Sequence, residues 1–321
     1  MINLRAQVAA AFAAVYLIWG STYLAIRFVE ESLPPFFMAG TRFLIAGLIL
    51  YVLTRLRGAR RETRADWGKM FVTGGLMLLG GHGAVVWAEQ VVPSGLTSLL
   101  VGTVPLWIAI MDWVWNRSKP NAKVAAGSVL GFFGVMLLVG GVASLGASSV
   151  DIVSAAILVS GAFLWANGSL YSRSTKLSAS PLLSTAMEMT AGGLLLLLAS
   201  LITGEWTRVR LDLVSVHSAA SWVYLIIFGS LIGFTSYIWL LKMVSPSQVS
   251  TYAYVNPIVA MLLGWWLANE PITLRNIVAA AIILAAVVVI TTFQTQGKPL
   301  GEAKEQSGVP PDSEHGGRVM A

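Results

Sequence analysis

The sequence predicts an all-α integral membrane protein with ten transmembrane helices, arranged as two inverted five-helix repeats. Of its 321 residues 56% are hydrophobic and only 11% are charged, and the mean hydropathy is +0.74. Soluble domains carry about a quarter charged residues. Many apolar runs reach the roughly 20 residues that a helix needs to cross the hydrocarbon core. Side chains of the first half also recur in the second half at fixed spacings, which indicates an internal repeat.

The apolar runs end at charged residues, Pro or Gly. Most are longer than an ordinary strand, and lipid offers no partner for an unpaired backbone group, so we expect helices. The first run is too long for a secretory signal and lacks a clear cleavage site, so it is expected to be a retained helix. The expected spans lie near residues 8–28, 35–55, 68–88, 94–115, 123–142, 151–172, 181–203, 219–242, 247–268 and 273–293.

Basic residues set the expected orientation. Most of the 21 Lys and Arg fall at the N-terminus, in alternate loops and in the C-terminal tail. Short cytoplasmic loops retain Lys and Arg, so this bias places both termini in the cytoplasm of a multi-pass protein of the cell inner membrane. The basic residues that fall elsewhere are Arg27, Arg42, Arg208, Arg210 and Arg275.

The net charge of +6 would suggest nucleic acid as a partner of a soluble protein. Here the charges lie in loops between apolar runs and orient the chain, so no nucleic acid partner is expected. The chain has no cysteine, which excludes a disulfide framework and a thiolate metal site. We predict no cofactor and no metal. The expected partners are membrane lipid and a small-molecule substrate, with protons as a further candidate, and a monomer is favoured.

Two spacings relate the halves of the chain. At 146 residues, Trp19, Pro35, Arg42 and Gly47 fall on Trp165, Pro181, Glu188 and Gly193; at 152 residues, Trp87, Pro105 and Trp113 fall on Trp239, Pro257 and Trp265. Chance similarity among apolar helices is the competing explanation. Five is an odd number of helices, so the second copy is expected upside down relative to the first, with a site near the midplane.

Several motifs carry a family resemblance. They are Trp19-Gly-Ser-Thr-Tyr23, the stretch Ala88-Glu-Gln-Val-Val-Pro-Ser-Gly-Leu96, the helix around Pro105 and the turn Asn269-Glu-Pro271. Together they resemble the ten-helix EamA branch of the drug/metabolite transporter superfamily. The resemblance implies an exporter of amino acids, other metabolites or drugs, with a central cavity between the halves. It implies EamA-like repeats over 8–142 and 151–293. The residues over 294–321 are rich in Gly, Pro, Glu and Ser with little apolar content, so a disordered cytoplasmic tail is expected there. The first copy has Asn116-Arg-Ser-Lys-Pro120 at the position of the turn that contains Glu270 in the second copy. Because the first copy has no acidic residue there, the symmetry of the repeat does not support a role for Glu270.

Ionisable residues inside apolar spans are candidates for function, because inserting each into the membrane costs about 2.5–3.5 kcal/mol on insertion scales. His82 lies among three glycines, and it is expected either to bind substrate or carry a proton, or to pack between helices. Arg42 and Glu188 hold equivalent positions, which favours mutual neutralisation, a zwitterion site or snorkelling. Glu89 is expected to act as a gate or to be a solvated helix end. All four are candidates for coupling or gating.

Mid-span aromatic residues give the second signal. Trp19 and Tyr23 are four residues apart, as are Tyr252 and Asn256, so each pair shares a helix face. Pro105 and Pro257 are expected to bend their helices or free a carbonyl. Such a wall suits solutes with aromatic or aliphatic groups, although packing is the competing explanation for each Trp. The predicted substrate-binding residues are Trp19, Tyr23, His82, Trp107, Trp165, Tyr252, Tyr254 and Asn256.

The predicted function is a secondary transporter that exports amino acids, aromatic or hydrophobic ones favoured, or related small metabolites, by alternating access. A multidrug exporter of amphipathic cations is the alternative, and a non-transporting sensor or assembly subunit is the rival of another class. Proton coupling and passive uniport both remain open. A membrane enzyme is not expected, since the sequence has no HExxH, no Asp-rich diphosphate motif and no Ser/His pair at plausible depth.

Overall fold

The computed structural model describes residues 3–59, 62–92, 94–117, 121–139, 152–175, 180–268 and 272–293. The expected tail over 294–321 and the turn with Glu270 lie outside the described residues. Within the described residues the chain is helical throughout, with no strand. The main helices are α1 (Leu4–Glu30), α2 (Pro35–Leu56), α3 (Arg64–Gly74), η1 (Gly75–His82), α4 (Gly83–Glu89), α5 (Ser94–Val101), α6 (Val104–Asn116), α7 (Ala122–Val139), α9 (Ile152–Ser174), α10 (Pro181–Ile202), α11 (Val216–Tyr224), η4 (Leu225–Phe234), α12 (Thr235–Met243), α13 (Pro246–Val249), α14 (Tyr252–Ala268) and α15 (Leu274–Phe293), and two short 3₁₀ turns, η2 (Glu205–Arg208) and η3 (Leu211–Leu213), join α10 to α11.

The predicted all-α membrane fold is confirmed. In the described part of the chain, eight continuous helical segments are long and apolar enough to cross a membrane. They are α1, α2, α3 with η1 and α4, α5 with α6, α9, α10, α11 with η4 and α12, and α15. The remaining expected spans are occupied by the shorter apolar helices α7 and α14. Each of the ten expected runs is therefore mostly helical where it is described, with short turns at Gly102–Thr103 and Ser250–Thr251.

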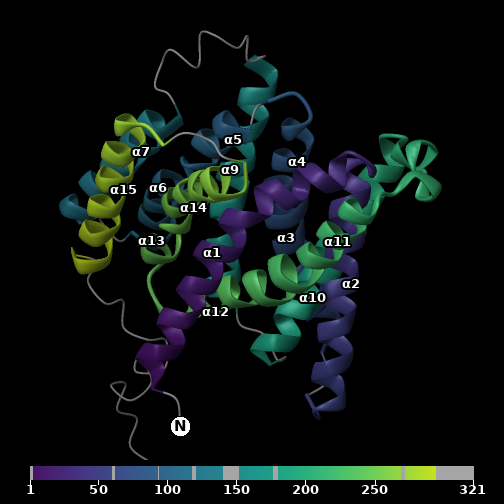
Figure 1. The fold of residues 1–321 in the computed structure, drawn as a ribbon. Helices are drawn as coiled ribbons and strands as arrows, with labels where there is room; N and C mark the ends of the chain where they lie inside the picture. Colours follow the sequence, from purple (N-terminus) through teal and green to yellow (C-terminus); the bar gives the residue numbers. More distant parts are fainter. Residues whose placement is uncertain are drawn as a thin grey trace, which may run out of the picture.

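Equivalent helices of the two halves pack against each other. Helix α2 lies along α10, and α7 lies along α15 (Figure 1). Both pairs are antiparallel: Gly40 of α2 meets Leu197 of α10 while Gly47 meets Thr190, so one helix runs down as the other runs up. Antiparallel pairing of equivalent helices is what a twofold axis in the membrane plane requires. The packing therefore supports the inverted repeat.

Glycine brings α2 and α10 into close contact. A Cβ atom at Gly47 would lie 2.6 Å from the backbone nitrogen of Thr190, and one at its equivalent Gly193 would lie 2.5 Å from the backbone nitrogen of Leu44. Only a residue without a side chain fits either position. Small residues allow this backbone approach between helices in lipid. The two equivalent glycines thus form the central contact between the halves.

The third helix of each half is interrupted by a π-helical segment. In the first half this segment is η1, and in the second half it is η4, at equivalent positions of the repeat. A π-helical turn inserts a residue and rotates the side chains that follow, and such turns occur often at functional sites. His82 and Phe234 end the two segments, and both side chains line the same cavity.

The loops gather at two ends of the bundle. At one end, Asn121 donates to the carbonyl of Phe293, Gln248 donates to that of Thr291, and Arg173 donates to that of Val244. All these loops are predicted to be cytoplasmic. At the other end, Glu205 accepts hydrogen bonds from the first amides of α2, and Ser218 donates to the carbonyl of Phe28.

Candidate functional site: a central aromatic cavity

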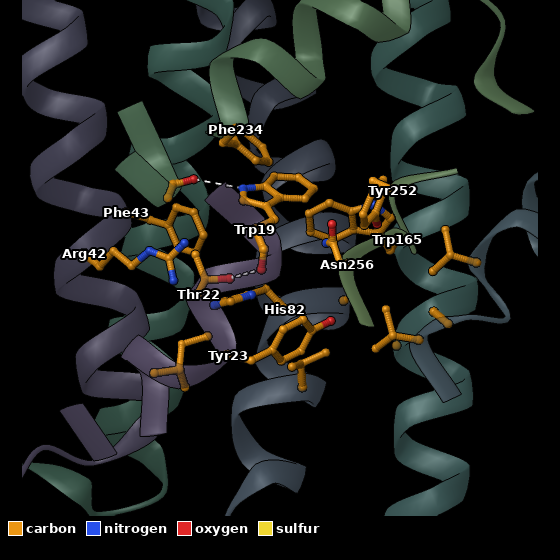
Figure 2. Close-up of a pocket in the computed structure, with 18 residues that line it drawn as sticks. Trp19, Thr22, Tyr23, Arg42, Phe43, His82, Trp165, Phe234, Tyr252 and Asn256 are labelled. Carbon is orange, nitrogen blue, oxygen red and sulfur yellow. Dashed lines mark hydrogen bonds between the residues drawn. The ribbon is translucent and has the colours of Figure 1, made fainter. Parts of the chain in front are cut away.

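A cavity of about 90 Å³, open to solvent at its mouth, lies between the halves. Helices α1, α2 and α9, the two π-helical segments and the start of α14 supply most of its wall (Figure 2). The wall is mostly aromatic and aliphatic, with few polar groups, as in small-molecule sites generally. The polar and aromatic side chains that line it are Trp19, Thr22, Tyr23, Arg42, Phe43, His82, Trp165, Phe234, Tyr252 and Asn256.

Trp19 and Trp165 stand at the centre of the cavity wall. Each indole lies against a glycine of the other half's π-helical segment: a Cβ at Gly233 would lie 2.5 Å from Trp19 Nε1, and one at Gly81 would lie 2.9 Å from Trp165 Cε3. The indole nitrogen of Trp19 donates to the carbonyl of Gly229 at 3.0 Å (Figure 2). Gly233 and Gly81 therefore make room for the side chains of Trp19 and Trp165.

A cluster of four aromatic rings closes one side of the cavity. Tyr237 is fully buried, with its ring centroid 5.1 Å from that of Trp19, 5.5 Å from that of Trp165 and 5.5 Å from that of Tyr252. Its hydroxyl accepts a hydrogen bond from Trp165 Nε1 at 3.0 Å and also bonds Ser169 at 2.7 Å. We call Trp19, Trp165, Tyr237 and Tyr252 the aromatic floor. Tyr237 is not among the residues predicted from the sequence, because no local signal distinguishes it within its helix.

Arg42 brings a buried cation to the cavity wall. Its Nε donates to the hydroxyl of Ser230 at 2.8 Å, and its guanidinium lies over the ring of Phe43, 4.7 Å from the centroid. The Nη1 atom is buried and has no hydrogen-bond partner. His82 also lines the cavity, its ring edge to face with that of Phe43 at 5.1 Å, and its Nε2 has no partner either.

The expected neutralisation of Arg42 by Glu188 is not found. Glu188 is buried in α10, where it accepts a long hydrogen bond of 3.4 Å from Ser172 and interacts electrostatically with Lys242. It does not line the cavity. The reason is the antiparallel packing of α2 and α10: residues equally far from the two helix starts lie at opposite depths. Arg42 and Glu188 are therefore separated along the helix pair.

Two of the predicted cavity residues lie elsewhere. Tyr254 is completely buried in a second core, where its hydroxyl donates to the carbonyl of Ser128 at 2.7 Å and its ring covers Gly131. Trp107 packs edge to face on Phe163 at 5.3 Å. Neither lines the cavity, so the expected wall is corrected at these positions. The cavity brings together Trp19, Tyr23, His82, Trp165, Tyr252 and Asn256, and their role in substrate binding stays a prediction.

The prolines and Glu89 occupy the surroundings of the cavity. Pro105 stands in the first turn of α6, directly after the break that separates α5 from α6, and Pro257 lies inside α14 next to Asn256. Glu89 ends α4; both of its carboxylate oxygens are buried without a hydrogen-bond partner, and it interacts electrostatically with Tyr23 and Glu30. A solvated helix end therefore does not describe Glu89. A gating role stays a prediction.

The described residues hold no group of His, Cys, Asp and Glu side chains arranged to bind a metal ion. The arrangement of the cavity is that of a binding site: aromatic faces for an apolar body, and unpaired nitrogens of Arg42 and His82 for a polar end.

The sequence and fold are similar to those of known transporters. The model of the EamA-like transporter family matches residues 7–140 and 153–292. The chain is 37% identical, over 91% of both chains, to the uncharacterized inner membrane transporter YedA of Escherichia coli K12. It is 25% identical to the uncharacterized transporter YoaV of Bacillus subtilis, over 87% of this chain and 94% of that protein.

A crystal structure with 20% sequence identity superposes with a TM-score of 0.74, covering 89% of this chain and 98% of the other. At this identity the likeness concerns the fold alone. The family match covers nearly the whole chain, in two segments that follow the two halves of the fold. The chain belongs to the EamA-like transporter family, within the drug/metabolite transporter superfamily, and is a multi-pass membrane transporter.

Proposed function

We propose that the protein exports amino acids with aromatic or other hydrophobic side chains, or related small metabolites, across the inner membrane by alternating access. The observation that carries this proposal is the composition of the cavity. Trp19, Trp165 and Tyr252 offer aromatic faces, while Arg42 and His82 offer unpaired nitrogens. A solute with an apolar body and a polar end matches both parts of the wall.

The way in which the halves meet supports alternating access. The aromatic floor closes the cavity with Trp19 from the first half and Trp165, Tyr237 and Tyr252 from the second. When the halves rock against each other, the floor parts and the cavity opens toward the opposite end of the bundle. The glycines at the contact between α2 and α10 have no side chains that interlock, so the two helices can slide against each other. One chain encloses the whole cavity, so we propose that the monomer is the transporting unit.

The loops at the end that holds Arg173 and Asn121 carry most of the basic residues. We propose that this end faces the cytoplasm, with both termini on the same side. The aromatic floor would then separate the cavity from cytoplasmic solute. Export begins when the floor opens on that side.

The test is solute flux in proteoliposomes. Labelled phenylalanine, a labelled polar amino acid and a cationic dye are loaded into vesicles that contain wild type, Trp165→Ala or the surface control Arg210→Gln. Loss of one aromatic contact should raise the half-saturating phenylalanine concentration about two- to tenfold in Trp165→Ala, with no change in Arg210→Gln. Efflux of the dye alone would favour the multidrug alternative, and no flux of any solute would overturn the proposal. A pH gradient that changes efflux would identify proton coupling, while equal rates would identify a uniporter.

A further inference from the structure

Arg42 is a positive charge in the cavity wall that no described carboxylate pairs with. Ion pairs within 4 Å occur at Arg55–Glu62 and Arg210–Asp212, and Arg42 forms none with a described carboxylate. Only 3% of Arg42 is exposed, and its interactions are the hydroxyl of Ser230 and the ring of Phe43. A buried unpaired cation is strongly unfavourable. A residue kept under that cost is expected to meet an anion at some point of the transport cycle.

The guanidinium is held in a fixed position by its surroundings. The bond from Nε to Ser230 and the contact with Phe43 orient the plane, and a Cβ at Gly229 would lie 2.8 Å from Nη2. The Nη1 atom remains without a partner. Guanidinium groups bind carboxylates through parallel N–H donors, with bonds about twice as strong as those between neutral groups. The free side of Arg42 therefore has the chemistry of a carboxylate receptor.

The described wall offers no anionic group to an ammonium group. The described lining has no Asp and no Glu. Glu89 interacts electrostatically with Tyr23 and Glu30 but does not line the cavity. His82 lies close enough to Arg42 to interact with it electrostatically. Its Nε2 atom, like Arg42 Nη1, has no hydrogen-bond partner. In the view of Figure 2 Arg42 lies on one side of Trp19, while Trp165 and Tyr252 lie on the other.

We infer that Arg42 binds the carboxylate of the transported solute, and that the substrate class is carboxylates with an aromatic or aliphatic body, for which an α-amino group is tolerated but not required. This inference rests on the proposed function and specifies the charge that its cavity selects. A solute with a free amine and no carboxylate would be repelled by Arg42 and find no anion in the described wall.

The first experiment varies the solute and leaves the protein unchanged. Purified wild type in detergent micelles, in chloride-free buffer, is titrated calorimetrically with phenylalanine, 3-phenylpropionate, phenylalaninamide and phenethylamine. These share the ring and differ in the carboxylate and the amine. We expect saturable binding of phenylalanine and 3-phenylpropionate at concentrations within about tenfold of each other, and binding of the other two weaker by about tenfold or more.

The outcomes separate this inference from the proposed function. Binding of phenethylamine as tight as that of phenylalanine, or binding of phenylalanine without 3-phenylpropionate, would overturn the inference and leave the proposed function standing. Binding and flux of none of the four would overturn both.

The second experiment varies Arg42. In Arg42→Gln the half-saturating concentration of 3-phenylpropionate should rise about tenfold or more, and the difference between 3-phenylpropionate and phenethylamine should disappear. Arg42→Lys keeps the charge and should retain a preference for the carboxylates. Arg210→Gln is the matched control and should bind as wild type does. Well-folded Arg42→Gln, judged by its melting profile, that still prefers carboxylates would overturn the inference.

Discussion

Trp19 and Trp165, the equivalent tryptophans of the two halves, meet edge to face with their ring centroids 5.8 Å apart and an interplanar angle of 77°. Each ring lies against the equivalent glycine of the opposite half, Gly233 or Gly81. One residue pair therefore contacts both halves at the level of the cavity. Movement of either half must displace an indole, which couples the shape of the cavity to the packing between the halves.

Gly233 is required for the position of Trp19. In Gly233→Ala the new methyl group would stand 2.5 Å from Trp19 Nε1, so the indole must move and its bond to Gly229 must break. Overpacking of this kind costs about 1–3 kcal/mol. We expect Gly233→Ala to have a lower melting temperature than wild type. Its transport rate should fall by a larger factor than its expression level.

Gly75→Ala is the matched control for that substitution. It also lies in a π-helical segment, but a Cβ there has its nearest contact at 3.5 Å, an ordinary van der Waals distance. Melting and flux of this variant should match wild type. If Gly233→Ala behaves as Gly75→Ala does, the glycine does not position the indole.

Tyr237 holds the aromatic floor together through its hydroxyl. Tyr237→Phe keeps the ring but leaves Trp165 Nε1 without its buried acceptor and Ser169 without one partner. Leaving a buried donor unsatisfied costs about 1–3 kcal/mol. We expect a destabilised protein in thermal melting, and a weaker floor that raises solute leak through proteoliposomes.

Tyr171→Phe provides the comparison for Tyr237→Phe. Tyr171 is partly buried in α9, and its hydroxyl makes no hydrogen bond to any described residue. Its replacement should change neither melting nor leak. Equal melting temperatures for the two variants would show that the hydroxyl of Tyr237 contributes nothing to the floor.

Much of the fold could be predicted because membrane helices obey simple rules. Run length, loop charge and the repeat located the helices, and the repeat also picked out Trp19 and Trp165. The two π-helical segments could not be predicted, since nothing in their composition distinguishes them from α-helix. They determine where His82 and Phe234 point, so the detailed cavity wall depends on a feature that the sequence hides.

The wrongly placed residues have geometric explanations. Tyr252 and Tyr254 are two positions apart on a helix, which places them about 200° apart around its axis. Only one of them can face the cavity, and the sequence does not say which. Arg42 and Glu188 are equivalent in the repeat, but in antiparallel helices equivalent residues lie at different depths unless they are near the crossing point, as Gly47 and Gly193 are.

The orientation can be tested because the chain has no native cysteine. Thr207 and Ser174 are exposed at opposite ends of the bundle. A membrane-impermeant maleimide added to intact cells should label Thr207→Cys and leave Ser174→Cys unlabelled until the cells are opened. The reverse pattern would place both termini outside the cell. The aromatic floor would then lie on the external side of the cavity instead of the cytoplasmic side.

The central claim, that solute binds between Trp19, Trp165 and Arg42, is tested most directly by protection of a cysteine in the cavity. Thr22 lines the cavity next to Trp19, and Thr22→Cys places a reactive thiol there, with Ser174→Cys as the control outside it. The rate of modification by a small methanethiosulfonate reagent is measured with and without phenylalanine. We predict that phenylalanine slows modification of Thr22→Cys in a saturable way and leaves Ser174→Cys unchanged. Equal rates at Thr22→Cys, at phenylalanine concentrations that saturate transport, would contradict the claim.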